Sequence, residues 1–195
     1  MTIKLLLILG INSSILLGCA TGMKQTEPPL QVVPHVDLDR YLGTWYEIAR
    51  FPFRIQEGCV ATQATYTLLE NGKIGVLNQC RKHGFDGELS TAKGKAWVVD
   101  KETNARLKVR FFWPYSGDYW IIDLGKNYNY AVVSQPNRKY LWVLSRTPQM
   151  DETLYDQILE RLRQQHFDVS RLIKTPQPTS QPIPVYPCEH ILIII

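Results

Sequence analysis

Residues 64–79, ATYTLLENGKIGVLNQ, contain the strongest turn signal in the chain. Apolar and polar residues alternate on either side of Asn71-Gly72, a dipeptide that favours a hairpin turn because both residues tolerate a positive φ. Alternation also places every second side chain on one face of a strand. The stretch therefore predicts two adjacent antiparallel strands.

Six further runs of alternating or β-branched residues surround this hairpin, at 45–51, 96–99, 107–112, 119–124, 130–134 and 140–146. With the hairpin they make eight strands, and the interval 43–146 gives each strand and its turn about 13 residues. That spacing leaves no room for crossover helices. We therefore expect an all-β fold, an eight-stranded antiparallel up-and-down barrel.

The interior of such a barrel is just wide enough to fill with side chains or to hold one small ligand. Strand parity places small Ala64 and Ala96 inside, together with large Tyr66, Phe111 and Trp142. This mixture predicts a partly empty cup.

After residue 146 the hydrophobic period changes. Apolar residues recur at helical spacing on a stretch rich in Glu, Asp, Arg and Gln, so residues 150–165 are expected to form one amphipathic helix capped by Asp151. We expect the helix to pack on the outside of the barrel. Its apolar residues are Leu154, Ile158, Leu159 and Leu162.

The N-terminal residues are typical of an export signal. Lys4 precedes an apolar stretch that ends before Cys19, and residues 1–18 are too short to span a bilayer. Residues 16–19, Leu-Leu-Gly-Cys, resemble a bacterial lipobox, which implies a diacylated Cys19 as the new N-terminus. The position after this cysteine holds Ala20 rather than Asp, which resembles the pattern of lipoproteins sent to the outer membrane. An ordinary signal peptide with an incidental cysteine is the alternative.

The remaining chain divides into a tether at 19–36, a domain at 37–174 and a tail at 175–195. The tail is set apart by five prolines between residues 175 and 187, which favour extended or disordered chain. Residues 191–195 are wholly apolar. They dock on the domain, touch lipid or form an exposed strand, and the sequence leaves these three options open.

The charged residues give little support for other functions. The net charge is +4 and the basic residues are scattered, so no nucleic-acid footprint is expected. No zinc-protease, Cys-x-x-Cys, serine-elbow or phosphate-loop motif occurs, so no metal, cofactor or catalytic residue is predicted. Cys80 with His83 is the one nearby nucleophile and base, which leaves a thiol-dependent enzyme as a minor alternative.

Three separated segments resemble the signature regions of the lipocalins: residues 43–46 (GTWY), residues 128–133 and residues 144–148 (LSRTP). The resemblance is closest to the bacterial outer-membrane lipoprotein lipocalins and their relatives, apolipoprotein D and the plant temperature-induced lipocalins. It covers residues 37–176. The resemblance implies the same barrel with one closed end.

The signature residues also have a physical interpretation. Gly43 permits a tight turn of the backbone, Trp45 is large enough to plug one end of a barrel, and Arg146 is a planar cation that can stack on an indole. Trp142 shares strand parity with Arg146 and is expected to point into the cup above it. We expect Gly43, Trp45 and Arg146 to be structural.

Five inward positions nearer the mouth are the ligand-binding candidates: Tyr66, Asn78, Val109, Phe111 and Trp142. The resemblance to apolipoprotein D implies pocket positions at Tyr66, Asn78 and Trp142. Each can instead be a filler or an outward residue. Tyr119 and Trp120 have opposite parity, and the pattern does not decide which of them faces inward.

Four cysteines remain to be assigned. With Cys19 acylated, an odd number is left in an oxidising compartment. Cys59 and Cys80 flank the hairpin and meet at its open end, where a bridge would contribute about 3 kcal/mol. The resemblance to apolipoprotein D implies Cys59 with Cys188 instead. The unpaired thiol can join two chains as a homodimer.

The sequence thus predicts a non-enzymatic protein, lipid-anchored at the bacterial outer membrane and facing the periplasm. It would bind or carry a fatty acid or lysophospholipid, and the family resemblance adds a part in envelope maintenance under stress. The alternative is an envelope scaffold or dimer module whose barrel is filled by its own side chains.

Overall fold

The computed structural model describes residues 27–179. The predicted export signal, Cys19, Cys188 and the apolar residues 191–195 lie outside this range. The barrel strands are β1 (Gly43–Arg50), β2 (Cys59–Leu68), β3 (Ile74–Lys82), β4 (Leu89–Val98), β5 (Arg106–Arg110), β6 (Gly117–Leu124), β7 (Tyr130–Ser134) and β8 (Leu141–Ser145). The other elements are α1 (Leu38–Tyr41), η1 (Arg54–Gln56), α2 (Glu152–Gln164), η2 (Val169–Arg171) and β9 (Ile173–Lys174).

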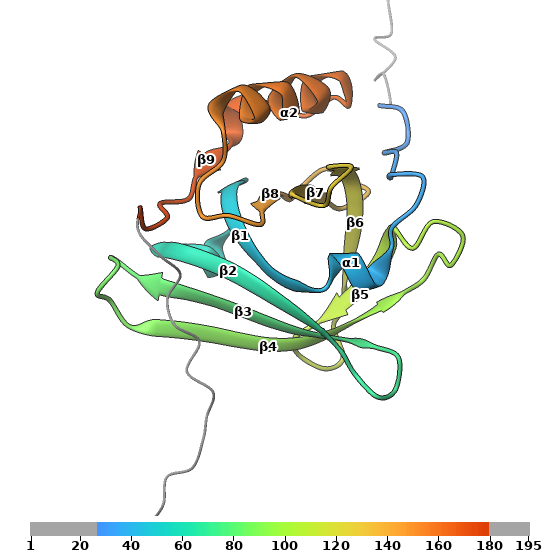
Figure 1. Cartoon of the computed structure of the whole chain (residues 1–195), viewed down its shortest axis with the longest axis horizontal. Helices are drawn as coiled ribbons and strands as arrows, with labels where there is room; N and C mark the ends of the chain where they lie inside the picture. The colour runs from blue at the N-terminus through green and yellow to red at the C-terminus, as the bar shows by residue number, and fades with distance from the viewer. Residues whose placement is uncertain (1–26, 180–195) are drawn as a thin grey trace, which may run out of the picture.

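The eight strands form a closed antiparallel barrel, as predicted (Figure 1). Each strand pairs with the next along the chain, and β1 closes the barrel by pairing with both β2 and β8. One short strand was not predicted: β9 pairs with β1 through Ala49 and Arg50.

The hairpin of residues 64–79 forms β2 and β3, with Tyr66 opposite Val76. Its turn spans residues 69–73, and Gly72 has the positive φ of +73°. Both strands are longer than predicted. A bulge between Val60 and Gln63 interrupts the alternation of β2, so the sequence pattern begins only after it.

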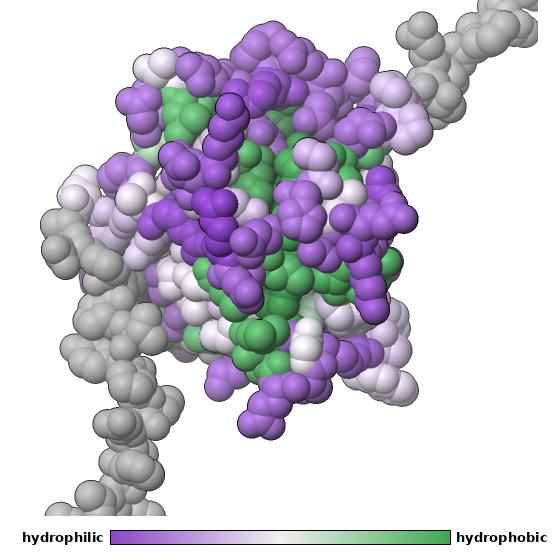
Figure 2. Space-filling model, turned by 45° about the vertical axis from the view of Figure 1, so that its right-hand side comes forward, coloured by the Kyte–Doolittle hydropathy of each residue, from purple (hydrophilic) through white to green (hydrophobic). Residues whose placement is uncertain are grey.

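Helix α2 lies outside the barrel, as predicted (Figure 1). The Asp151 carboxylate accepts a hydrogen bond from the backbone N–H of Leu154 at 2.9 Å and caps the helix. Tyr155, Ile158 and Leu162 are buried against the outer wall. The top of the molecule, where α2 lies, is mostly hydrophilic in Figure 2. In residues 27–179, no helix is long and apolar enough to cross a membrane.

The folded domain extends beyond both predicted boundaries. Leu30 and Val36, assigned to the tether, are buried, and Val33 N–H donates to the carbonyl of Ile121 at 3.0 Å. At the other end, Thr175 N–H donates to the carbonyl of Ile48 at 2.9 Å. Contacts with the barrel thus continue past residue 37 at one end and past residue 174 at the other.

One end of the barrel is closed by Trp45, which has no exposed surface. The Arg146 guanidinium lies 3.8 Å from the centre of its ring. The same guanidinium donates to the carbonyls of Thr44 and Arg40 at 3.0 and 2.6 Å. Gly43 has a φ of +91°, and a Cβ there would lie 3.3 Å from Arg146 Nη1. The positive φ favours glycine, and a side chain there would also press on the Arg146 guanidinium.

Candidate functional site

The barrel contains a cavity of about 550 Å³. It lies toward the end opposite Trp45, where the connections at 51–58 and 111–116 and Gln135 contribute to its rim. A volume of this size is ordinary for a small-molecule site. The alternative of a barrel filled by its own side chains is therefore contradicted.

All five predicted ligand positions line this cavity: Tyr66 from β2, Asn78 from β3, Val109 from β5, Phe111 just after β5, and Trp142 from β8. Tyr119 faces inward, whereas Trp120 packs on the outer cluster under α2. Of the small inward residues, Ala64 lines the cavity. Ala96 lies deeper, beside a void of about 10 Å³.

Three tyrosines form the floor of the cavity. The Tyr119 hydroxyl is 2.8 Å from the hydroxyl of Tyr41 and 2.9 Å from that of Tyr66. Burial raises the pKa of Tyr66 to about 12 and raises the pKa of the other two well above the usual value. These hydroxyls are neutral and already paired, so the floor is a packed boundary with no free charge.

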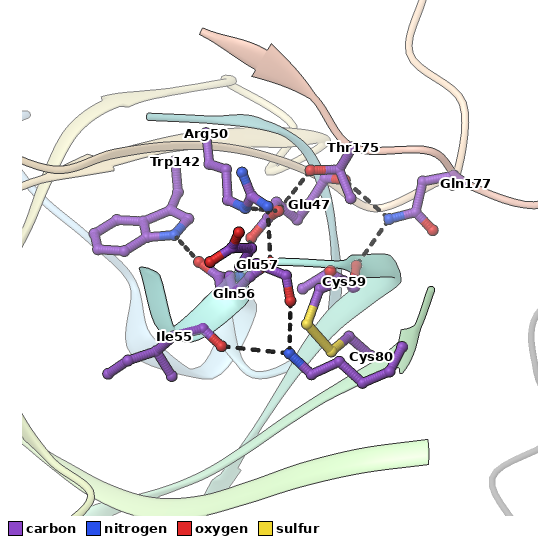
Figure 3. Close-up of polar contacts among 12 residues, drawn as sticks. Glu47, Arg50, Ile55, Gln56, Glu57, Cys59, Cys80, Trp142, Thr175 and Gln177 are labelled. Atoms are coloured by element: carbon purple, nitrogen blue, oxygen red, sulfur yellow. Dashed lines mark hydrogen bonds and ion pairs between the residues drawn. A yellow bond between two sulfur atoms is a disulfide. The ribbon is translucent and has the colours of Figure 1, made fainter. Parts of the chain in front are cut away.

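The polar side of the cavity is built around Glu47 of β1, which is only 3% exposed. Burial raises the pKa of this carboxyl, an effect opposed by hydrogen bonds from Thr175 and Gln56 and by the nearby Arg50. Arg50 Nε lies 3.3 Å from Glu47 Oε1. The carboxylate is thus held by partners from three parts of the chain (Figure 3).

Residues 54–56 form η1, a short lid at the rim of the cavity. Two hydrogen bonds of Gln56 hold the lid in place (Figure 3). Gln56 Nε2 donates to the Glu47 carboxylate at 2.6 Å, and Gln56 Oε1 accepts from Trp142 Nε1 at 3.0 Å. Lys82 Nζ donates to the carbonyl of Ile55 in the lid at 3.5 Å and to that of Glu57, just after the lid, at 2.8 Å. The lid is therefore tied to β1, β3 and β8, and the cavity wall and lid form one hydrogen-bonded unit.

Cys59 and Cys80 form a disulfide beside the lid, with their Cα atoms 5.5 Å apart. The pairing predicted from the hairpin is confirmed. A bonded Cys80 has no thiol to act as a nucleophile, so the Cys80–His83 alternative is contradicted. Among residues 27–179, no cluster of three or more His, Cys, Asp or Glu side chains suits a metal ion.

Asn78 Oδ1 is a buried acceptor in the cavity wall that has no hydrogen-bond partner among residues 27–179. An unpaired buried acceptor costs about 1–3 kcal/mol, a cost that a ligand donor can remove. The other walls near it are largely apolar or aromatic. The cavity thus has the chemistry to hold an apolar body and to orient one polar group.

Sequence reasoning missed Glu47, Phe53, Ile55 and Gln56. Glu47 has the same strand parity as Trp45, a signal that it points inward. The lid residues carry no periodic pattern, and their position became visible only once the β1–β2 connection folded over the rim.

A closed antiparallel barrel with a plugged end and an apolar cavity defines a β-barrel of the small-molecule-binding class. The chain belongs to the lipocalin-like family, because residues 36–177 match the family model described as Lipocalin-like domain. The resemblance read from the three signature segments is therefore confirmed.

Similar proteins of known name support this family assignment. Temperature-induced lipocalin-1 of Arabidopsis thaliana is 42% identical over 162 residues, which cover 78% of this chain and 86% of that protein. The outer membrane lipoprotein Blc of Escherichia coli K12 is 41% identical over 158 residues, covering 78% and 87%. Among solved structures, insecticyanin from Manduca sexta superposes with a TM-score of 0.64 at 19% identity, covering 79% and 87%, and supports the fold alone.

Proposed function

We propose that the protein binds and carries a single-chain amphiphile, a fatty acid or lysophospholipid, at the bacterial outer membrane. The observation that carries this proposal is the cavity of about 550 Å³ with largely aromatic and aliphatic walls. Burial of an acyl chain contributes roughly 25 cal/mol per Å² of apolar area. No bond is made or broken in this mechanism.

The position of the polar groups supports an amphiphile over a plain hydrocarbon. Asn78 offers an unpaired amide oxygen inside the cavity, and rotating the amide would present its N–H donors instead. A hydroxyl or carboxyl head group can pair with one or the other. Glu47 lies on the same lining surface, but its carboxylate is already paired with Arg50, Gln56 and Thr175.

The outer-membrane location rests on the relatives named as outer membrane lipoproteins and on the lipobox-like residues 16–19. Two or three acyl chains on Cys19 would hold the domain at the membrane without a spanning helix. A role in envelope maintenance under stress belongs to the same proposal.

The test is displacement of a dansyl-labelled undecanoic acid by palmitic acid and by palmitoyl-lysophosphatidylethanolamine. We expect both to displace the probe. Trp142→Ala removes part of the cavity wall and should change affinity by roughly tenfold. Trp120→Ala, on the outer wall, is the matched control and should leave affinity unchanged. Failure of both lipids to displace the probe, or an equal effect of both variants, overturns the proposal.

A further inference from the structure

The loop that joins β5 to β6 exposes three aromatic side chains at the cavity rim. Phe112, Trp113 and Tyr115, here called the aromatic tip, are 75%, 82% and 79% exposed. Exposure of large aromatic side chains to water is unfavourable, and a contiguous exposed cluster of them is typical of an interaction site. Ile55 of the lid and Phe85 of the β3–β4 loop are also exposed.

The outer surface beside the aromatic tip is basic. Lys93 and Lys95 alternate with inward Ala92 and Ala96 along β4, and Arg110 ends β5 just before the tip. These three cations, here called the basic wall, form no ion pair with any acid of residues 27–179. Lys95 also stands directly opposite Arg110 across the ladder. Like charges directly opposite one another are destabilising. Arg110 also lies 5.4 Å from the centre of the Trp97 ring, whereas Lys93 and Lys95 have no such aromatic contact among residues 27–179.

The N-terminal end of the described chain lies at the same rim. Arg138, in the connection between β7 and β8, donates to the carbonyl of Pro28 at 2.7 Å and lies 3.6 Å from the Glu27 carboxylate. Gln135, three residues before Arg138, lines the cavity together with Gly117, where the loop with the aromatic tip ends. Residue 19 precedes Glu27 by eight positions, which can span at most about 28 Å. An anchor at Cys19 would therefore hold this rim close to the membrane.

We propose that the aromatic tip and the basic wall dock this rim on an anionic lipid bilayer. Aromatic rings favour the membrane interface, and lysine and arginine are attracted to anionic head groups. The two features lie side by side where the cavity opens. The docking does not require a bound ligand. Given the proposed function, docking would let an amphiphile pass between bilayer and cavity without crossing bulk water.

The test uses the chain from residue 19 onward, the form expected after removal of the export signal, carrying Cys19→Ala so that no acyl chain contributes. Sedimentation measures its partition onto vesicles of phosphatidylethanolamine and phosphatidylglycerol in a three to one ratio. We expect binding to these vesicles, much weaker binding to phosphatidylcholine vesicles, and loss of the difference in half-molar salt. Equal binding to both lipids overturns the proposal, as does no binding.

Two variants locate the surface. The double variant Lys93→Gln with Lys95→Gln should weaken partition by about 30-fold, because each lysine contributes separately to the attraction for the anionic surface. Trp113→Ala should weaken it by about tenfold. The controls at the opposite end are Lys101→Gln with Lys126→Gln and, separately, Leu68→Ser, a change at another exposed apolar residue. These should bind like the parent, and an equal loss in the controls overturns the proposal.

Ligand binding without vesicles separates this proposal from the proposed function. Trp113, Lys93 and Lys95 do not line the cavity, so their variants should bind the dansyl-labelled acid with unchanged affinity. Should no form bind that probe while partition follows the expected order, the carrier function fails and the docking surface stands. The reverse pattern eliminates the docking surface alone.

Discussion

The two ends of the barrel use the same eight strands in opposite ways. At the closed end, Trp45 is fully buried beneath Arg146, and three tyrosine hydroxyls are paired with one another. At the open end, Trp142 is only partly buried and faces a cavity of about 550 Å³. Residues at the closed end should therefore determine stability, and residues at the open end should determine affinity for a ligand.

The largest effect that tests this contrast is expected from Trp45→Ala. Removal of a fully buried indole should lower the free energy of unfolding by about 3–5 kcal/mol, because nothing else fills its volume. Trp142→Ala removes the same side chain from a site already open on one side and should cost clearly less. Urea unfolding of both variants measures the difference. Equal losses would mean that the open end is packed like the closed end.

A smaller effect is expected from Arg146→Lys. Lysine keeps the charge but loses the planar group that lies on Trp45 and donates to the carbonyls of Thr44 and Arg40. Leaving such acceptors without a donor should cost about 1–3 kcal/mol. Arg54→Lys, at an exposed position of η1, is the control and should change the thermal midpoint little. A neutral Arg146→Lys result would show that the plug needs only a positive charge.

The smallest effect concerns the dependence of stability on pH. Burial raises the pKa of Tyr66 to about 12, against about 10 in an unfolded chain. Between these values the folded protein holds a proton on Tyr66 that the unfolded chain has lost. The contribution of this group to the free energy of unfolding is therefore complete below pH 10 and is lost as pH rises toward 12. Unfolding free energies at pH 9 and 11 should therefore fall less in Tyr66→Phe than in the parent.

The exposed Tyr115 provides the comparison for that experiment. Tyr115→Phe removes a tyrosine that is not part of the buried cluster, so the loss of stability between the two pH values should match that of the parent. A Tyr66→Phe protein that loses as much stability as the parent would show that burial does not raise the pKa of Tyr66 in the folded protein.

Local pattern was enough to predict the strands, the outer helix and the five cavity positions. Tyr66, Asn78 and Val109 could be placed because their strands alternate regularly there. The choice between Tyr119 and Trp120 needed the register of β6, whose pairing with β7 shifts between Ile121 and Asp123. The position of the lid could not be predicted from local pattern at all, because Gln56 meets Glu47 and Trp142 only after β1 and β8 pair.

The strand segments, the turn of the main hairpin and the apolar face of each strand could all be predicted from the amino-acid pattern. These properties depend on neighbours within a few residues. The partly empty interior is visible only in the folded barrel, because the volume left unfilled depends on the side chains of all eight strands together. Folding also brings cations from separate strands together on one surface. Lys95 and Arg110 are far apart along the chain and meet only through the pairing of β4 with β5.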